Sequence, residues 1–506
     1  MYNAFGQIEK GQDTGVDLQF IPVLGEFGII GVAVFYGVWA LFALRVFSFK
    51  RLVKGLNINE IAAGGLLTFW LVNSYTNHIR ELPALALGFF FFLGMTMPPA
   101  ETSKQPGDGV LFFVHSFWPM NGGVEQQALR QAKGLRARGF DVRVLTAQHQ
   151  KGLKKYEIVE SVPIYRFWYP YWISFKPLRK LANVIAGLLA FSQMPRKFQF
   201  RLLHIHQLQW FSIVGYLFKK KFGYKILGKG TSSGYRSDGL KFYDTLSILK
   251  GLAERLHLRE RVYASIDKVV CISRIMVDEL ATYGVPKQNL VYVPNGIPLP
   301  NLAKADYGKE AGSMVSSMRF VPVKNPQLHV LAAIKLHKYH PELSFTYTIF
   351  GPGELLEETR QIVQASHATT YIKLPGATPN AEVLSVLSTA SLFLNVSLSE
   401  GLSNSILESM SLGVPMLISD VGGAGDLIGS ELPDGNRKNW QKFTNGGLVS
   451  PDISADALAD VLYEMLSDQE YLHKAGQSAR LIIEKEFALD IVLDKYEKLY
   501  RQLLPA

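Results

Sequence analysis

Two glutamates, Glu400 and Glu408, are separated by seven residues. The apolar run 390–396 before them is typical of a buried parallel strand, and residues 405–412 after Glu400 are typical of a helix. We therefore place Glu400 on a loop at the carboxyl end of a strand and Glu408 in a helix. Ligands of open α/β sheets bind at this end of the strands. Carboxylates there accept hydrogen bonds from hydroxyl groups, and the turn Ser403–Ser405 can offer N–H groups to a diphosphate, a combination that suits a sugar nucleotide.

Two glutamates alone would fit a solvated loop residue and an exposed helix residue. The context favours a site, because residues 414–420 predict a second buried strand that runs into Gly422 and Gly423, where backbone can approach a phosphate. The sequence has, in this order, a glutamate, a glycine, the second glutamate, a glycine, a proline, a strand and a Gly-Gly turn. In this it resembles the retaining glycosyltransferases of family 4. The resemblance covers about residues 108–503 and implies a GT-B fold, which is an α/β fold of two Rossmann-like, doubly wound domains.

The resemblance also implies roles for the residues of this second half. Glu400 would bind hydroxyls of the donor sugar, and Glu408 would bind those of the ribose. Arg319 and Lys324 lie five residues apart after a predicted strand, and paired cations neutralise the charge that grows on a departing nucleoside diphosphate. The alternative is two surface cations. The further substrate-binding residues predicted in this half are Gly351, Gly401, Leu402, Ser403 and Asn404.

The first half begins with the apolar run 110–115, which predicts a parallel strand buried on both faces. Gly122 and Gly123 precede a predicted helix at 124–138. By itself, a Gly-Gly pair in this place is explained equally simply as a tight turn. The family has Gly-Gly-x-Glu between donor and acceptor, and the resemblance therefore predicts substrate contacts for Gly122, Gly123 and Glu125.

Residues 202–206 predict a strand that ends in two histidines on one face, His204 and His206. These histidines can be structural or can suggest a metal pair, but no third ligand is arranged nearby in the sequence. The family has an active-site histidine at the end of this strand. We therefore predict that His206 is catalytic and that His204 packs in the interior.

No metal and no cofactor are predicted, because the chain contains no Asp-x-Asp motif. The single cysteine, Cys271, excludes a disulfide framework and is expected in the core. Near the end of the chain, residues 445–449 predict an edge element, and an amphipathic helix at 489–504 is expected to cross back to the first half.

Three apolar segments precede both halves, at about 21–44, 58–75 and 82–97. They predict about three transmembrane helices, although interfacial or core helices remain an alternative. Positive charge between the first two segments places that loop and everything after residue 97 in the cytoplasm, which suggests a multi-pass protein of the bacterial inner membrane. The run 23–31 also resembles the last membrane segments of O-antigen ligases and polymerases.

Charge is distributed unevenly along the chain. Residues 108–297 carry 29 Lys and Arg against 12 Asp and Glu, whereas residues 298–506 carry 17 against 24. Basic residues alternate with aromatic ones between 165 and 221, a composition that suits a membrane interface or single-stranded nucleic acid. The membrane segments favour the bilayer, and a solvated basic surface is the plainer alternative.

Together these observations predict a membrane segment at 1–107, an acceptor domain at 108–297 and a nucleotide-sugar domain at 298–506. The predicted enzyme transfers sugar from a UDP- or GDP-sugar to a lipid-linked glycan acceptor at the membrane, with no nucleic-acid partner. A catalytically inactive or truncated membrane-bound binding module is the alternative. A Rossmann oxidoreductase is disfavoured, because no Gly-x-Gly-x-x-Gly follows the first strand of the acceptor domain.

Overall fold

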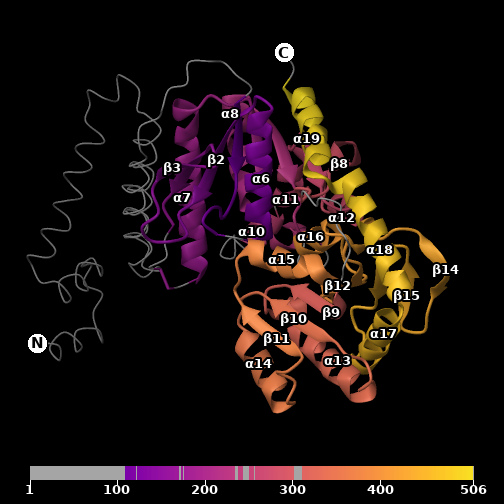
Figure 1. Ribbon diagram of the computed structural model, residues 1–506. Helices are drawn as coiled ribbons and strands as arrows, with labels where there is room; N and C mark the ends of the chain where they lie inside the picture. The colour runs from indigo at the N-terminus through magenta and orange to yellow at the C-terminus, as the bar shows by residue number, and fades with distance from the viewer. Residues whose placement is uncertain are drawn as a thin grey trace, which may run out of the picture. The chain divides into compact units, whose positions relative to one another are not determined.

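The computed structural model describes residues 109–504, except for 121, 170–172, 175, 234–237, 243–249, 256 and 301–309. The three apolar segments that we predict to be transmembrane lie outside these residues. Among the helices that the structure does describe, none has both the length and the apolar character needed to cross a bilayer. The described residues form two eight-stranded sheets within one compact unit (Figure 1).

The first sheet has the strand order β3-β4-β2-β1-β5-β6-β7-β8. All neighbours run parallel except β3 and β4, which form an antiparallel pair. Its strands are β1 Gly109–Phe113, β2 Asp141–Ala147, β3 Tyr156–Val159, β4 Val162–Phe167, β5 Leu202–His206, β6 Lys225–Lys229, β7 Lys268–Cys271 and β8 Leu290–Tyr292. The central strands β1 and β5 are buried on both faces, as the continuous apolar sequence of β1 predicts.

Helices cover both faces of this sheet. Phe113 on one face packs with residues of α7 and α8, whereas Phe112 on the other face packs with residues of α6 and α19. The helices of this half are α6 Gly123–Ala137, α7 Lys176–Lys197, α8 Trp210–Phe222, α9 Asp238–Lys241, α10 Lys250–Arg255, α11 Leu258–Ala264, α12 Arg274–Thr282 and the 3₁₀ turn η4 Lys287–Asn289. This sheet is therefore doubly wound, as the sequence predicts.

The second sheet has the order β11-β10-β9-β12-β13-β16-β15-β14. Its strands are β9 Glu310–Ser317, β10 Thr346–Phe350, β11 Ile372–Gly376, β12 Ala390–Asn395, β13 Met416–Ser419, β14 Glu431–Asn436, β15 Trp440–Phe443 and β16 Gly446–Val449. The prediction of an edge element at 445–449 is wrong, because β16 pairs with β13 on one side and with β15 on the other. The hairpin of β14 and β15 extends the sheet beyond β16, and the sequence Glu-Leu-Pro-Asp-Gly-Asn of β14 gives little sign of a strand.

Helices also cover both faces of the second sheet. α13 and α17 contribute to one buried cluster, and α15 and α16 contribute to the cluster on the opposite face. The helices are α13 Pro326–Tyr339, α14 Leu356–Ala365, α15 Asn380–Thr389, α16 Asn404–Ser411, α17 Ala455–Ser467, α18 Gln469–Ile482 and α19 Leu489–Leu503, with 3₁₀ turns η5 Pro322–Lys324 and η6 Ala424–Asp426 and the π-helical turn η7 Ile483–Phe487.

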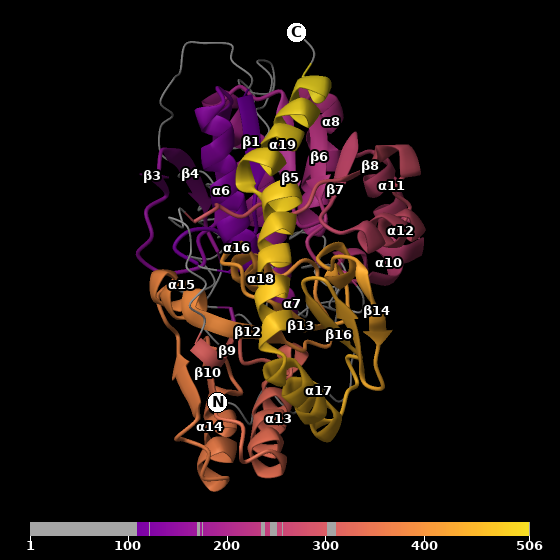
Figure 2. The same cartoon turned by 45° about the vertical axis from the view of Figure 1, so that its right-hand side comes forward.

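The last helix, α19, returns to the first sheet (Figure 2). Leu493 lies so close to Gly134 of α6 that a Cβ at residue 134 would come within 2.3 Å of it. The hydroxyl of Tyr500 lies 2.6 Å from Nδ1 of His204 on β5. The predicted crossover helix is thus confirmed, and it packs on the same face of the sheet as α6.

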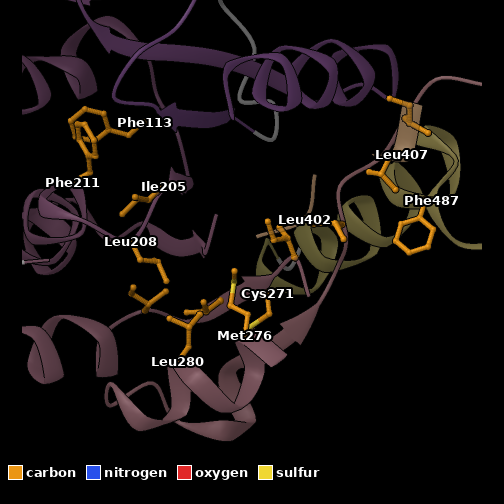
Figure 3. Close-up of a cluster of buried hydrophobic side chains, with 14 of the residues drawn as sticks. Phe113, Ile205, Leu208, Phe211, Cys271, Met276, Leu280, Leu402, Leu407 and Phe487 are labelled. Carbon is orange, nitrogen blue, oxygen red and sulfur yellow. The ribbon is translucent and has the colours of Figure 1, made fainter. Parts of the chain in front are cut away.

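One hydrophobic cluster contains side chains from both halves of the chain (Figure 3). Cys271 and Met276 of the first half and Leu402 and Leu407 of the second belong to it, together with Phe487 at the start of the return to α19. Cys271 is fully buried, as predicted, and burial raises the pKa of its thiol to about 12. Shared apolar burial therefore helps to hold the two halves together.

A group of buried polar side chains lies beneath α6 and α19. His204 and His206 are fully buried, with ring centroids 4.3 Å apart, and Lys229 is 3% exposed. The ammonium of Lys229 lies 5.7 Å from the ring centroid of Tyr496. Burial lowers the pKa of Lys229 to about 7, because the charged form loses its hydration.

Replacing Lys229 with methionine should stabilise the protein at and below pH 7. Between about pH 7 and the pKa of an unfolded lysine, the unfolded chain binds a proton that the folded chain lacks, so stability of the wild type should rise with pH. An uncharged side chain removes this pH dependence. It also removes the cost of burying or deprotonating the lysine, which lowers the free energy of unfolding by on the order of a few kcal/mol. Denaturant unfolding of Lys229→Met and wild type at pH 6.5 and 9 measures the difference. Lys373→Met, which changes an exposed lysine on β11, serves as the control; equal pH slopes for all three proteins would contradict the expectation.

Candidate functional site

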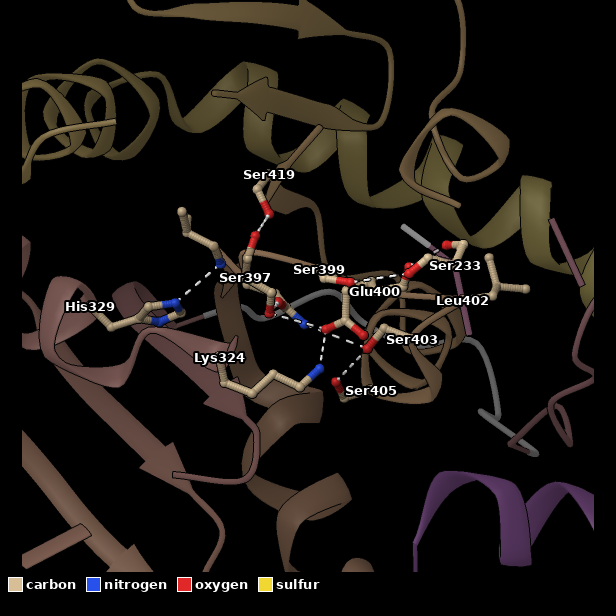
Figure 4. Close-up of polar contacts among 12 residues, drawn as sticks. Ser233, Lys324, His329, Ser397, Ser399, Glu400, Leu402, Ser403, Ser405 and Ser419 are labelled. Carbon is tan, nitrogen blue, oxygen red and sulfur yellow. Dashed lines mark hydrogen bonds and ion pairs between the residues drawn. The ribbon is translucent and has the colours of Figure 1, made fainter. Parts of the chain in front are cut away.

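Glu400 lies in the loop between the end of β12 and the start of α16 and forms an ion pair with Lys324 (Figure 4). The hydroxyl of Ser397 donates a hydrogen bond of 3.0 Å to Oε1 of the same carboxylate. The side chains of Glu400 and Lys324 are only 14% and 16% exposed. Glu400 is therefore not a solvated loop residue, and the structure brings two of the predicted catalytic residues into direct contact.

Lys324 belongs to the short 3₁₀ turn η5, which follows β9. β9 and β12 are neighbours in the parallel sheet, so the loops that follow them meet at the same edge. The backbone N–H of Leu398 donates to the carbonyl of Val323 at 2.9 Å and joins the two loops directly. Arg319 lies at the start of the same loop with an exposed side chain, and the described part of the chain shows no ion pair for it.

Gly351 supports this cation-bearing loop through the backbone. Its φ is +129°, and a Cβ there would lie 1.8 Å from the carbonyl oxygen of Met318. The close approach lets Met318 N–H donate to Phe350 O at 2.9 Å and Phe320 N–H donate to Pro352 O at 2.8 Å. Gly351 thus has a clear role in positioning the segment between β9 and η5. Its predicted contact with substrate stays a prediction.

Glu408 is buried in α16 and forms an ion pair of 3.1 Å with Arg130 of α6. The interpretation of Glu408 as an exposed helix residue is therefore wrong. Burial raises the pKa of this carboxyl, and the Arg130 guanidinium partly opposes the rise. The ion pair joins the two halves of the chain.

Asn404, the first residue of α16, makes further contacts with α6. Its Nδ2 donates to the carbonyl of Gly123 at 3.0 Å, and its Oδ1 accepts from Nε2 of Gln127 at 3.0 Å. The predicted residues Gly123 and Asn404, far apart in the sequence, thus meet where α6 and α16 begin. Both helix N-termini offer backbone N–H groups, which favour anions.

Gly122 and Glu125 also lie close together at the start of α6. The carboxylate of Glu125 folds back over the turn, where a Cβ on Gly122 would lie 2.3 Å from Oε2. The hydroxyl of Ser116, in the loop after β1, donates a hydrogen bond to Oε1 of Glu125. These contacts fix the conformation of the predicted Gly-Gly-x-Glu segment.

A loop of the first half covers the backbone around Glu400. The hydroxyl of Ser233 donates to the carbonyl of Glu400 at 2.8 Å, and the hydroxyl of Ser399 donates to the carbonyl of Ser233 at 3.3 Å. Asp238 organises this loop by accepting from Thr231 N–H at 2.7 Å and from the Ser232 hydroxyl at 3.0 Å. The first half therefore contributes directly to the surroundings of Glu400.

A small pocket lies next to Glu400 in the second half. Its lining includes Gly401, Leu402 and Ser403 of the predicted site, together with residues of the loop that follows β13. The polar side chains of the lining come from the ends of β12 and β13 and from the turn before α16, and the apolar side chains include Leu402, Ile406 and Ile418. The predicted donor-binding turn and Glu400 thus line the same pocket.

The structure does not join His206 to this group of residues. His206 is fully buried at the end of β5, 4.8 Å from the ring of Phe112, and burial lowers its pKa. No contact links it to Glu400 or Lys324 in the part of the chain that the structure describes. Its predicted catalytic role stays a prediction, whereas His204 packs in the interior as expected.

Sequence reasoning missed Arg130, Ser397 and Asp238. Ser397 could have been noticed as a polar residue directly after a buried strand, and Asp238 as a carboxylate after a loop rich in serine and glycine. Arg130 gives no such signal, because it is one of many cations in a basic segment. Its importance follows only from the packing of α6 against α16.

Comparison with known proteins matches each half of the chain to a known domain family. Residues 122–296 match the Glycosyl transferase 4-like domain, and residues 304–482 match Glycosyl transferases group 1. Sucrose-phosphate synthase from Thermosynechococcus elongatus has a similar structure, with a TM-score of 0.62 and 20% sequence identity over 78% of this chain and 99% of that protein. The two matched domains are both glycosyltransferase domains, and the structural similarity shows the GT-B fold.

Two curated relatives have names that describe a particular transfer reaction. The chain is 26% identical over 236 residues to the UDP-N-acetylglucosamine--peptide N-acetylglucosaminyltransferase GtfA subunit of Streptococcus pneumoniae, covering 46% of this chain and 44% of the relative. It is 25% identical over 245 residues to the UDP-Gal:alpha-D-GlcNAc-diphosphoundecaprenol alpha-1,3-galactosyltransferase of Escherichia coli, covering 46% and 57%. The chain thus spans about half the length of these curated relatives.

Replacing Arg130 with methionine should destabilise the protein at pH 7 by about 3 kcal/mol, because it leaves the buried Glu408 carboxylate without its cation. The pKa of Glu408 is already raised by burial and should rise further. When the pKa of a carboxyl is higher in the folded than in the unfolded chain, stability falls as pH rises above the unfolded pKa. The loss of stability in Arg130→Met should therefore become smaller toward pH 4.

A double-mutant cycle with Glu408→Gln measures this coupling by denaturant unfolding. Lys133→Met is the matched control, because Lys133 is also on α6 but pairs with Glu160 on the exposed surface. Additive effects of Arg130→Met and Glu408→Gln would show that the ion pair does not hold the two halves together.

Proposed function

We propose that the protein is a retaining glycosyltransferase that moves a sugar from a nucleotide sugar to a lipid-linked glycan acceptor in polysaccharide synthesis. The observation that carries the proposal is the pairing of Glu400 with Lys324 beside the N-terminus of α16. A carboxylate for sugar hydroxyls and a cation for phosphate stand together at the carboxyl edge of the second sheet. Such a pair can bind both ends of a sugar diphosphate.

The nucleoside diphosphate leaving group would lie at this helix N-terminus. Backbone N–H groups at the start of α16 and the ammonium of Lys324 would stabilise the negative charge that grows on it during bond cleavage. Arg319 is close enough in sequence to add a second cation from the same loop. In a retaining transfer the acceptor hydroxyl attacks from the face that the nucleotide leaves, and the departing phosphate helps to take its proton.

Glu408 would bind the ribose hydroxyls, and this role requires part of its carboxylate to be shared with or released by Arg130. Gly122, Gly123 and Glu125 would lie between donor and acceptor, because Gly123 contacts the first residue of α16. His206 would take part from the first half. These assignments require no metal ion, because side chains and helix N-termini supply the compensating charge.

The names of the two relatives support a UDP-sugar as donor, and a GDP-sugar is the second possibility. The galactosyltransferase relative acts on a diphosphoundecaprenol-linked sugar, which supports a lipid-linked acceptor. The apolar segments before residue 98 and the basic first half fit a protein of the bacterial inner membrane with its catalytic domains in the cytoplasm.

The experiment uses membranes that contain the full chain, supplied in turn with UDP- and GDP-sugars and a polyprenyl-diphosphate-linked acceptor extract. Sugar incorporation into lipid and nucleotide release are followed, with Glu408→Ala as the control. Incorporation from one donor that the control loses supports the proposal and identifies the sugar. Absence of both signals with every donor supports the alternative, an inactive or truncated binding module.

Lys324→Ala should lower turnover about 100-fold, because the leaving diphosphate loses a preorganised cation. Arg319→Ala should lower turnover in the same direction. Lys335→Ala is the control, since Lys335 lies on α13 and pairs with Asp456 at the surface. Turnover is compared at saturating donor, with thermal unfolding in parallel; unchanged turnover in Lys324→Ala would exclude its assigned role.

A further inference from the structure

A continuous chain of hydrogen bonds lies behind the Lys324–Glu400 ion pair. Val396 N–H donates to Nε2 of His329 at 3.1 Å, and Nδ1 of His329 lies 2.9 Å from the hydroxyl of Tyr347. The Tyr347 hydroxyl lies 2.6 Å from Oγ of Ser316, which donates to the carbonyl of Leu394 at 2.5 Å. Ser316, His329 and Tyr347 are fully buried. We refer to these three side chains as the buried relay.

The direction of every bond in the buried relay is fixed by its ends. A backbone N–H only donates, so Nε2 of His329 accepts and the proton of the neutral ring is on Nδ1. A carbonyl only accepts, so the Ser316 hydroxyl donates to Leu394 and must itself accept from Tyr347. The Tyr347 oxygen then accepts from His329. Burial lowers the pKa of His329 to about 4, which keeps the ring in this neutral form at neutral pH.

Both ends of the buried relay lie on the backbone of one short segment. Leu394 is the penultimate residue of β12, and Val396 directly follows its last residue. The next residue, Ser397, donates to Glu400, and the carbonyl of Ser397 accepts from the Ser419 hydroxyl at 2.6 Å (Figure 4). The relay therefore fixes the segment from which the Glu400 loop starts.

The buried relay also fixes the segment that carries Lys324. His329 lies in the first turns of α13, which begins at Pro326, two residues after Lys324. Its ring reaches across to β12, and Tyr347 and Ser316 bring in the neighbouring strands β10 and β9. One set of buried bonds thus ties the element after Lys324 to the strand before Glu400.

We propose that Ser316, His329 and Tyr347 are positioning residues that set the geometry of Lys324 and Glu400 for sugar transfer. This inference rests on the proposed function, because it assigns the buried relay to the transfer step. None of the three side chains touches the pocket next to Glu400. They act through the backbone of β12 and the start of α13, and loss of the relay should reduce turnover more than donor binding.

The test uses Tyr347→Phe in the full chain, in the membrane transfer assay with the donor that the wild type accepts. The substitution removes one hydroxyl, keeps the ring and leaves Nδ1–H of His329 with only the Ser316 hydroxyl, 3.5 Å away, as an acceptor. We expect kcat to fall about 10- to 100-fold while KM for the nucleotide sugar changes less than about threefold, as expected for a displaced catalytic group. His329→Gln, which can still accept from Val396 N–H, should retain more kcat than His329→Leu.

Tyr471→Phe is the matched control. Tyr471 is a buried tyrosine of the same half, and its hydroxyl shares its proton between the carbonyls of Phe443 and Gly446, which lie 2.8 and 2.5 Å away. Thermal unfolding should show a comparable loss of stability for both Tyr→Phe variants, because each loses a buried hydroxyl bond. Only Tyr347→Phe should lose kcat.

The possible outcomes separate the two proposals. A wild-type rate in Tyr347→Phe, or an equal loss of kcat in Tyr471→Phe, would show that the buried relay contributes only stability and would overturn the inference alone. A wild-type chain that transfers no sugar from any donor would overturn the proposed function and, with it, the inference that rests on it. A selective loss of kcat in Tyr347→Phe, together with partial retention in His329→Gln, supports the positioning role.

Discussion

The burial of the Glu400 carboxylate is the constraint on which the site depends. A charge held out of solvent in the loop after the buried strand β12 is costly unless a cation and hydrogen-bond donors compensate it. Lys324 and Ser397 supply that compensation. Both side chains must be held in place, so the loops after β9 and β12 need fixed positions relative to each other. The pairing of β9 with β12 and the hydrogen bond from Leu398 N–H to the carbonyl of Val323 hold the two loops in these positions.

The second constraint is the contact between α6 and α16, which connects the two sheets. Asn404 bonds to Gly123 and Gln127, and one to two turns further along, Glu408 pairs with Arg130. The buried carboxylate of Glu408 is thus stabilised by the opposite half of the chain. Any separation of the two halves would have to break this ion pair and the bonds of Asn404. The ionised form of Glu408 therefore depends on the contact between the two halves.

The packing of α19 on the first sheet, beside α6, helps to hold α6 in place for its contact with α16. Tyr496 and Tyr500 pack over the buried polar side chains of β5 and β6, and Tyr500 bonds to His204. The segment from α18 to α19 contributes Phe487 to the hydrophobic cluster that both halves share. The C-terminal helix is consequently part of the core of the first half, although it follows the second sheet in sequence. A polar group such as Lys229 is tolerated in that core because its pKa falls on burial.

The sequence by itself determined the elements and the class of fold. Continuous apolar runs and glycine turns predicted β1, β5, β12 and β13 with their following helices, because strands buried on both faces leave an unbroken apolar pattern. The spacing of Glu400 and Glu408 and the adjacent turn predicted a site at the carboxyl edge of the second sheet. The strand order, in contrast, has no local signal, and β16 was wrongly expected at an edge because the polar sequence of β14 conceals the hairpin beyond it. Only the tertiary structure decided that Lys324 rather than Arg319 pairs with Glu400, that Arg130 pairs with Glu408 and that His206 is buried, because these contacts depend on packing between segments 76 to 278 residues apart in sequence. Periodicity and motifs report on neighbours along the chain, whereas partners brought together by sheet order and helix packing are set by the fold as a whole.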